Sequence, residues 1–355
     1  MSESENIVVE TAERMFADLA DAQSIIASRS DAWKAPVWDA LADAGLTLPW
    51  IDEALGGAGA DLATGFALLQ AAGRAALAVP LAETMIAGWL LARAGLSSPA
   101  GAMTVAPAQP NGRITLSADG TLSGRARNVP FAADARHIAV LASTADGALA
   151  IALVETAACQ IAAGNTLAGD AVNGVTFDRV RPIAQAPAPA GVDLTALMLM
   201  GAAARSLQIA GALETALDIT VRYANERVAF EKKIGKFQAI QHSLARLAGE
   251  VAAAVSAAGS AADTLSGGQV AGDALLLEVA AAKIRCGEAA EVGAAIAHQV
   301  HGAIGFTSEH ILHRFTLRAQ SWRDDFGPES HWAVALGRRV AARGADDLWP
   351  LVASR

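Results

Sequence analysis

The sequence predicts an α+β fold in which a β region lies between two helical regions. Apolar residues recur with helical spacing up to about residue 100, alternate from about 101 to 183, and return to helical spacing from about 193. The strand-like segments follow one another without intervening helices, which favours antiparallel pairing in a barrel or sandwich. We therefore predict an N-terminal all-α domain over 1–100, a middle antiparallel β-barrel domain over 101–185 and a C-terminal four-helix bundle over 186–355.

In the first region, apolar residues at three- and four-residue spacing predict helices over 10–27, 32–44, 62–76 and 81–94. Many of these positions are alanine, which favours helix and allows close packing. Gly56, Gly57 and Gly59 interrupt the pattern between the second and third helices.

In the second region, alternating apolar residues predict strands over 114–116, 121–124, 137–141, 148–154 and 174–177. The dipeptides at 119–120, 146–147 and 173–174 are Asp-Gly, Asp-Gly and Asn-Gly, which are typical of hairpin turns. A stretch rich in proline and alanine at 184–190 predicts a linker to the last region.

The third region predicts four helices, over 193–225, 237–266, 273–302 and 329–343. In the second of them, apolar residues at 237, 240, 244, 247, 251 and 255 form one stripe. Gly267 and Gly268 end that helix. Long helices of this kind predict a bundle.

Composition narrows the class of protein. The 355 residues are 53% hydrophobic and 18% charged, so the chain is long and apolar enough for a large core. A formal net charge of −9 argues against nucleic acid as a partner. Cys159 and Cys286 lie far apart in sequence, and we expect buried thiols in a reducing compartment.

The sequence predicts no targeting or membrane segment. The first six residues are acidic and lack the layout of a signal peptide. The apolar stretch at 81–96 is interrupted by Glu83 and Arg93, which favours a core helix over a membrane span. We therefore expect a soluble cytoplasmic protein without a membrane partner.

Residues 227–242 are the first candidate site. Arg227 offers a cation for a phosphate, Phe230 and Phe237 offer flat apolar rings, and Gln238 offers hydrogen bonds at the start of a helix. This combination suits an anionic cofactor that carries a ring. The alternative is a corner between two helices with a solvated basic turn at Lys232 and Lys233.

Residues 299–307 are the second candidate site. Gly302 and Gly305 end a helix and let backbone amides approach a ligand closely, while Gln299 and His301 offer side-chain bonds. The alternative is a glycine C-cap followed by a tight turn.

Other clusters carry weaker signals. His310 and His313 have a spacing that suits a metal, but no acidic or cysteine ligand accompanies them, so we expect polar histidines on a helix surface and no metal. Asp324, Asp325 and Glu329 precede or open the last helix, where capping is the expected role. The chain has no Walker loop, no dinucleotide-binding glycine motif and no nucleophile elbow.

The two candidate sites together resemble the signatures of the acyl-CoA dehydrogenase family. Residues 223–241 are similar to its Arg-x-x-Phe-Gly-x-x-Ile-x-x-Phe-Gln motif, and residues 299–307 to its Gln-x-x-Gly-Gly-x-Gly turn. The glycines at 56–59 and the segment 80–84 fit its N-terminal helical domain. The resemblance covers nearly the whole chain and implies an α domain, a β domain and a four-helix domain, in agreement with the periodicity.

The resemblance implies FAD as the cofactor, held across a subunit interface. By position, Arg227 would meet the FAD pyrophosphate. The adenosine part would be lined from the neighbouring subunit by Phe230, Ile234, Phe237 and Gln238 and backed by Gln299, Gly302 and Ala303.

The reaction implied by the resemblance is α,β-dehydrogenation of an acyl-CoA thioester. A carboxylate removes the α-proton, hydrogen-bond donors hold the thioester oxygen, and the flavin accepts a hydride. The resemblance also implies an electron-transfer flavoprotein as the electron acceptor, and fatty acid or sterol side-chain catabolism as the setting.

The sequence departs from the family where the base belongs. One family position for the base falls on Phe326 or Gly327, and the other falls on Gly201. Neither carries a carboxylate, so the catalytic residue is not assigned. Glu231 and Ala303 replace glycines of the two motifs, and the family's Thr-Glu-Pro-x-x-Gly-Ser-Asp stretch is missing.

These departures resemble the shorter subunit of heteromeric bacterial acyl-CoA dehydrogenases. There, a larger homologous chain supplies the base, as in a heterotetramer, and the shorter chain completes the FAD site. One alternative is a self-sufficient homo-oligomer with a displaced base at Glu329 or Asp325. Another is a flavin monooxygenase or a non-redox scaffold on the same fold.

Overall fold

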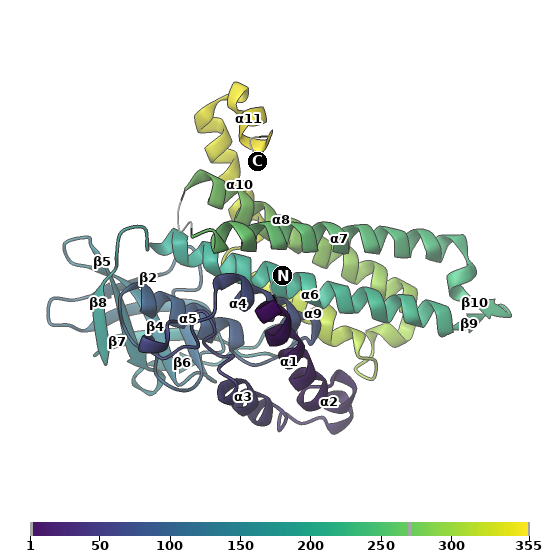
Figure 1. Cartoon of the computed structure of the whole chain (residues 1–355), viewed down its shortest axis with the longest axis horizontal. Coiled ribbons are helices and arrows are strands. Elements are labelled where there is room, and N and C mark those ends of the chain that lie inside the picture. Colours follow the sequence, from purple (N-terminus) through teal and green to yellow (C-terminus); the bar gives the residue numbers. More distant parts are fainter. Residues whose placement is uncertain (1–2, 269–271, 354–355) are drawn as a thin grey trace.

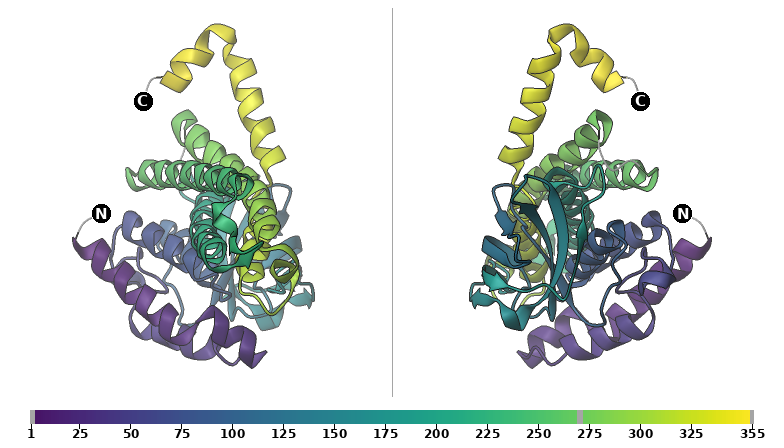
Figure 2. Two further views of the ribbon diagram at one scale, coloured as in Figure 1. Left: turned by 90° about the vertical axis from the view of Figure 1, so that its right-hand side faces the viewer. Right: turned by 90° about the vertical axis from the view of Figure 1, so that its left-hand side faces the viewer.

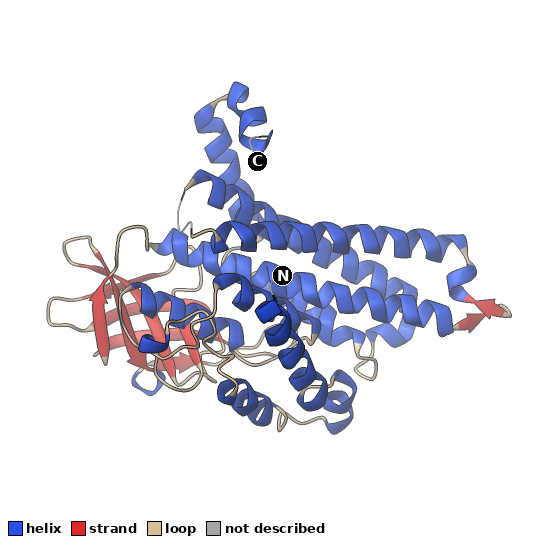
Figure 3. Cartoon of the chain, viewed as in Figure 1, coloured by secondary structure: helices blue, strands red, loops and turns tan. Residues whose placement is uncertain are grey.

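An eight-stranded sheet lies at one end of the molecule, and long helices extend from it (Figures 1 and 3). The computed structural model describes residues 3–268 and 272–353. Helices precede the sheet in sequence and a helix bundle follows it, so the predicted α+β class and its order of regions are confirmed.

The N-terminal helices are α1 (Glu3–Leu19), α2 (Ala22–Ser28), α3 (Lys34–Asp43), α4 (Leu62–Arg74) and α5 (Leu81–Arg93), with the short 3₁₀ helix η1 (Glu53–Leu55) before α4. The single helix predicted over 10–27 is wrong, because α1 and α2 are separate. The carboxylate of Asp21 accepts a hydrogen bond from the Ser24 amide at 2.8 Å and so caps the start of α2.

The sheet contains β1 (Met103–Ala106), β2 (Arg113–Leu116), β3 (Leu122–Pro130), β4 (His137–Thr144), β5 (Leu149–Glu155), β6 (Gln160–Ala162), β7 (Val172–Val180) and β8 (Ala184–Pro187), with the 3₁₀ helix η2 (Thr156–Ala158) after β5. Its order is β6-β7-β3-β2-β4-β5-β8, with β1 also on β4. Most neighbours are antiparallel, as predicted, but β1 and β2 pair in parallel with β4. The sheet is mixed because the chain leaves the β2–β3 hairpin and crosses to the other side of β2 before β4 begins.

Two of the three predicted hairpin turns are confirmed, at Gly120 and Gly147, which have φ of +76° and +84°. The third prediction is wrong, because Asn173-Gly174 lies inside β7. The buried side chain of Asn173 accepts a hydrogen bond from the Ala133 amide at 2.9 Å, and so it serves a neighbouring loop.

The linker predicted over 184–190 is also wrong in its first half. Residues 184–187 form β8, which pairs with β5 at the edge of the sheet. An edge strand tolerates Pro187 because one side of the strand needs no amide donor.

The C-terminal bundle is built from α6 (Leu194–Glu226), α7 (Gln238–Ser266), α8 (Asp273–His301), α9 (Leu312–Trp322) and α10 (Glu329–Arg343), and α11 (Leu348–Ala353) follows. Short elements connect them: β9 (Val228–Ala229), β10 (Lys232–Lys233), and the 3₁₀ helices η3 (Ile234–Lys236), η4 (Gly302–Phe306) and η5 (Ala345–Asp347). The four predicted helices are present, whereas α9 and α11 are not predicted by the sequence.

α6 is the central helix of the molecule. By length and composition it is able to cross a membrane, but its most apolar window is entirely buried, which is typical of the core helix of a soluble protein. Two glycines bring α4 and α6 into backbone contact. A Cβ on Gly211 would lie 2.1 Å from the Gln70 carbonyl, and one on Gly73 would lie 2.3 Å from the Gln208 carbonyl.

One apolar core joins all three parts of the chain. It runs from Val9 on α1, through Met103 and Leu153 on the sheet, to Trp332 on α10, and a smaller core covers the other side of the sheet. Beyond Trp332, α10 and α11 project from the body as an arm (Figure 2). Trp349 on this arm is 76% exposed.

Candidate functional site

The first candidate segment forms a hairpin at the end of the bundle farthest from the sheet (Figures 1 and 3). Arg227 ends α6, β9 and β10 pair antiparallel, and the Ile234 amide donates to the Arg227 carbonyl at 2.9 Å. The segment is therefore a small ordered hairpin and not only a loop between two helices.

Exposed rings and cations gather on this hairpin. Phe230 is 89% exposed and meets Phe237 edge to face at 6.3 Å between ring centres. The Lys232 ammonium lies 4.4 Å from the centre of the Phe237 ring. Arg227 and Gln238 are exposed, and Gln238 is the first residue of α7. A phenyl ring this exposed beside free cations is suited to a planar, anionic group from outside the chain.

The second candidate segment lies at the same end of the bundle. Gln299 is on the last turn of α8, and Gly302 and Ala303 open η4; all three are exposed, and Gly302 has a φ of +65°. Tyr223, near the end of α6, donates its hydroxyl to the His301 carbonyl at 3.2 Å, and the two rings stack at 4.3 Å. The ends of α6 and α8, which carry the two candidate segments, are therefore joined directly.

The histidines near this turn are packed together and not spread over a helix surface. His310 lies 4.7 Å from His301, ring centre to ring centre, and both are at least partly buried. Burial, and after it repulsion from His313 and His298, lowers the pKa of His310. Burial also lowers the pKa of His298 and of His301. Within residues 3–268 and 272–353, no group of three metal-binding side chains lies close enough to hold a metal ion.

The two family positions for the base meet in space. A Cβ built on Gly201 would lie 2.2 Å from the ring of Phe326. Phe326 is completely buried and has a left-handed φ of +54°. An apolar ring therefore lies where the resemblance to the family predicts a carboxylate.

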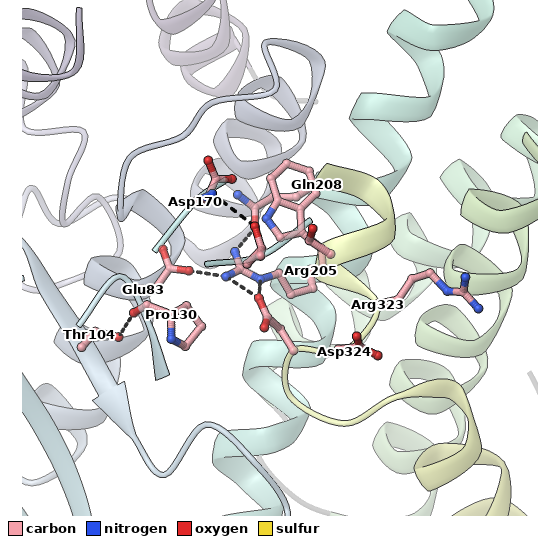
Figure 4. A network of polar contacts seen from close by, with 12 residues as sticks. Glu83, Thr104, Pro130, Asp170, Arg205, Gln208, Arg323 and Asp324 are labelled. Carbon is pink, nitrogen blue, oxygen red and sulfur yellow. Dashed lines mark hydrogen bonds and ion pairs between the residues drawn. The ribbon is translucent and has the colours of Figure 1, made fainter. Parts of the chain in front are cut away.

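A buried network of charges lies beside this ring. Arg205 on α6 pairs with Glu83 on α5 and with Asp325, whose Oδ2 lies 2.9 Å from the arginine Nε. Gln208 accepts a further hydrogen bond from Arg205. Figure 4 shows Arg205 between Glu83 and Gln208. The Arg205 guanidinium also lies 5.9 Å from the Phe326 ring centre, within the range of a cation–π contact between the charge network and the ring.

Neither proposed displaced base is free. Burial raises the pKa of the Asp325 carboxyl, although Arg205 and Lys283 oppose that shift. Glu329 accepts a hydrogen bond from Arg323 Nε at 2.6 Å. Glu329 stands in the first turn of α10, as expected, but Pro328 holds the N-cap position. The capping role is wrong for Asp325, which faces Arg205.

A buried lysine fixes the backbone of the same loop. Lys283 on α8 is fully buried and donates to the carbonyls of Trp322 at 3.2 Å and Arg323 at 2.6 Å. Burial lowers the pKa of Lys283 to about 8. The residues before Phe326 are thus held from both α6 and α8.

A cavity of about 250 Å³ lies between the sheet and this loop. Its lining combines polar residues, Gln109, Asn128, Asn165, Thr166, Ser321, Asp324 and Asp325, with the apolar residues Leu167 and Val172. Aromatic side chains are missing from this lining, in contrast to the hairpin. Exposed rings and cations therefore come together at the hairpin and not in this cavity.

The sequence alone does not identify Glu83 and Arg205 as partners. A signal was present in the sequence: Arg205 is the sole charged residue from 194 to 213, and Glu83 stands in an apolar helix. Isolated charges in buried helices are paired in most proteins. Which charge pairs with which depends on the packing of α5 on α6 and on the 323–326 loop, and periodicity does not contain that information.

Two family models match this chain. Residues 2–98 match the acyl-CoA dehydrogenase N-terminal domain, and residues 191–329 match the acyl-CoA dehydrogenase C-terminal domain. The matched ranges flank the sheet and include the hairpin, the η4 turn and Phe326.

Relatives agree with these matches. Acyl-CoA dehydrogenase IpdE2 of Mycobacterium tuberculosis is 28% identical over 276 residues, which cover 76% of this chain and 75% of the relative. The IpdE2 of Mycolicibacterium smegmatis is 26% identical over 332 residues, which cover 92% of this chain and 96% of the relative.

Solved structures share the fold over nearly the whole chain. The ChsE4–ChsE5 complex from Mycobacterium tuberculosis matches with a TM-score of 0.86 and 24% identity, over 96% of this chain and 98% of that chain. The steroid acyl-CoA dehydrogenase Tcur3481–Tcur3483 matches with a TM-score of 0.84 and 26% identity, over 96% and 98%. By its sequence signatures, its fold and these relatives, the chain belongs to the acyl-CoA dehydrogenase family.

Proposed function

We propose that this chain is one subunit of a heteromeric, FAD-dependent acyl-CoA dehydrogenase. Its hairpin and η4 turn complete an FAD site at the interface, and a larger homologous chain supplies the catalytic base. The observation that carries this proposal is the contact of Phe326 with Gly201, which puts an apolar ring at both family positions for the base.

The charged residues around Phe326 also support a base that comes from another chain. A general base must be ionised and within hydrogen-bond reach of the proton it removes. Asp325 and Glu329 are each engaged by an arginine, and Glu83 is buried against Arg205. These carboxylates are already engaged by arginines, which supports a base supplied by another chain.

The hairpin suits a cofactor that is shared between chains. Arg227 would contact the pyrophosphate, and Phe230, Ile234, Phe237 and Gln238 would contact the adenosine part. Gln299, Gly302 and Ala303 would support it from the neighbouring turn. When bound, FAD supplies the electron sink for removal of two hydrogens from the acyl group.

The relatives guide the choice of substrate and partner. Tcur3481–Tcur3483 is described as a steroid acyl-CoA dehydrogenase, and ChsE4–ChsE5 is a complex of two different chains. For this chain we propose an acyl-CoA substrate from sterol side-chain or fatty acid catabolism, electron transfer to an electron-transfer flavoprotein, and a place in the cytoplasm.

Anaerobic titration with acyl-CoAs tests the proposal. The purified chain, alone and after co-expression with a homologous larger chain, is followed by the visible flavin spectrum. We expect little flavin, or flavin that stays oxidised, in the chain alone and bleaching in the complex. Bleaching in the chain alone would contradict the proposal.

Two variants then test whether Glu329 or Asp325 is the catalytic base. In the complex, Glu329→Gln and Asp325→Asn are expected to keep bleaching if the protein folds, since neither residue would act on the substrate. A loss of several orders of magnitude in the bleaching rate, with folding unchanged by circular dichroism, would make that residue the base.

A further inference from the structure

Three side chains outside the candidate site gather four buried N–H donors that have no acceptor in the described part of the chain. The donors are Nε1 of Trp33, Nε and Nη2 of Arg314, and Nε of Arg318. The Arg314 guanidinium lies 5.8 Å from the Trp33 ring centre, and Arg318 Nη1 donates to the Arg314 carbonyl at 3.3 Å. Leaving a buried donor without a partner is costly, so four together indicate an acceptor from outside the chain.

The charges around these donors are not balanced. Arg318 is 5% exposed and pairs with Asp170 at 2.7 Å. The acidic groups that face Arg314 are Asp170, already bound to Arg318, and Asp31, an exposed side chain bound to Lys34 at 2.8 Å. Two guanidinium groups therefore share one buried carboxylate. Burial, and then the repulsion from Arg318, lowers the pKa of Arg314 to about 10.

The free donors of Arg314 indicate the kind of ligand. Nε and Nη2 lie on one edge of the Arg314 guanidinium, and their parallel N–H bonds match two oxygens of one anion. Nε1 of Trp33 and Nε of Arg318 supply two further neutral or charged donors.

We propose that Trp33, Arg314 and Arg318 form a binding site for an oxyanion that presents two oxygens, a carboxylate or a phosphate. The site lies where the start of α3, the loop before β7 and the start of α9 meet. It shares no residue with the hairpin, the η4 turn or the network around Arg205. A test of this oxyanion site is therefore independent of the proposed dehydrogenase function.

Calorimetric titration of the full chain tests this site. Inorganic phosphate and acetate are titrated separately at constant ionic strength, with chloride as the background anion. We expect saturable binding of one equivalent of at least one of them. Phosphate at least tenfold tighter than acetate identifies a phosphoryl ligand, and the reverse order identifies a carboxylate; absence of saturable binding of either anion would overturn the proposal.

Variants assign the binding to these residues. Arg314→Gln is expected to weaken binding roughly tenfold or more, because a charge-assisted pair is lost. Arg314→Lys keeps the charge without the paired donors and is expected to lose most of the same affinity. Arg338→Gln removes an exposed arginine of the arm and is expected to leave affinity unchanged.

Folding does not limit the test. If Arg314→Gln fails to fold, Trp33→Phe keeps an aromatic ring, removes one donor and is expected to weaken binding roughly fivefold. Affinity that is unchanged in Arg314→Lys and Trp33→Phe, or an equal loss in Arg338→Gln, would show that the anion binds elsewhere.

Discussion

Gly201 and Phe326 show how single residues determine what this chain is able to do. The ring of Phe326 fits only because residue 201 has no side chain. Gly201→Ala is expected to lower the free energy of unfolding by about 1–3 kcal/mol, because the added methyl overlaps the ring. Urea denaturation measures this loss.

The double variant gives the matched control. Phe326→Ala alone is expected to cost about 3–5 kcal/mol through the cavity it leaves. In that background Gly201→Ala is expected to be neutral or to stabilise by up to about 1 kcal/mol, because alanine favours helix. Additive losses would mean that the two residues are not in contact.

Arg205 holds two buried carboxylates. Arg205→Met is expected to lower the free energy of unfolding by about 3–5 kcal/mol near neutral pH, because Glu83 and Asp325 lose their partner. Burial already raises the pKa of both carboxyls, and loss of the arginine raises these pKa values further. A carboxyl whose pKa is higher in the folded than in the unfolded state adds most to the free energy of unfolding below its unfolded-state pKa. That contribution is lost as the pH rises through the folded-state pKa.

The pH dependence of this variant follows from that sign. The free energy of unfolding that Arg205→Met loses relative to the parent chain is expected to be smaller at pH 4.5 than at pH 8. Urea denaturation at each pH measures this loss. The exposed arginine Arg246 supplies the control Arg246→Met, with no comparable deficit. An Arg205→Met deficit that is equal at both pH values would contradict the assigned network.

Arg227 tests the hairpin as a cofactor contact. Arg227→Ala is expected to weaken FAD retention in the assembled complex by about 1.5–3 kcal/mol, the usual contribution of a charge-assisted hydrogen bond. Flavin remaining after dilution and filtration gives the measurement. The exposed arginine Arg93 on α5 serves as control, and equal retention in Arg227→Ala and Arg93→Ala would remove the assignment.

At the scale of elements, the sequence predicts the helices that periodic apolar residues define. It does not predict the short strands that form only by pairing with distant strands. The bounds of α10 agree with the predicted helix over 329–343 because apolar spacing and flanking breakers define them. β1 and β8 are missed because each is four residues long and is stabilised by pairing with distant strands. The candidate residues of the hairpin are readable from their motif, whereas the charges around Arg205 come together only through packing.

The arm formed by the outer part of α10 and by α11 contacts the body through Leu336 and through the ion pairs of Arg339 and Arg343 with Asp273, and α11 has no buried residue in the described part of the chain. Beyond Trp332 its residues are exposed or half exposed. A chain that ends at Arg343 is therefore expected to keep its free energy of unfolding within about 0.5 kcal/mol. Urea denaturation of the shortened chain checks this, and early tryptic cleavage after Arg338 in the full chain is the companion measurement. A loss of several kcal/mol would show that the arm packs on the body.

At the scale of the whole molecule, the continuous core predicts one cooperative unfolding transition. The apolar core joins α1 to α10 through the sheet, and the buried Arg318–Asp170 pair ties α9 to the sheet. Neither helical region is therefore able to lose its packing without exposing the core of the other. We expect tryptophan fluorescence, which reports both helical regions, and far-UV circular dichroism to give coincident urea transitions.

A variant sharpens this test of cooperativity. Arg318→Met leaves Asp170 buried without its partner and is expected to cost about 3–5 kcal/mol. If the core is one unit, both probes shift to lower urea together and by the same amount. A circular dichroism transition that separates from fluorescence in the variant would mean that the chain unfolds in more than one step, and that the contacts of Met103 and Leu153 with the helical core do not couple the regions.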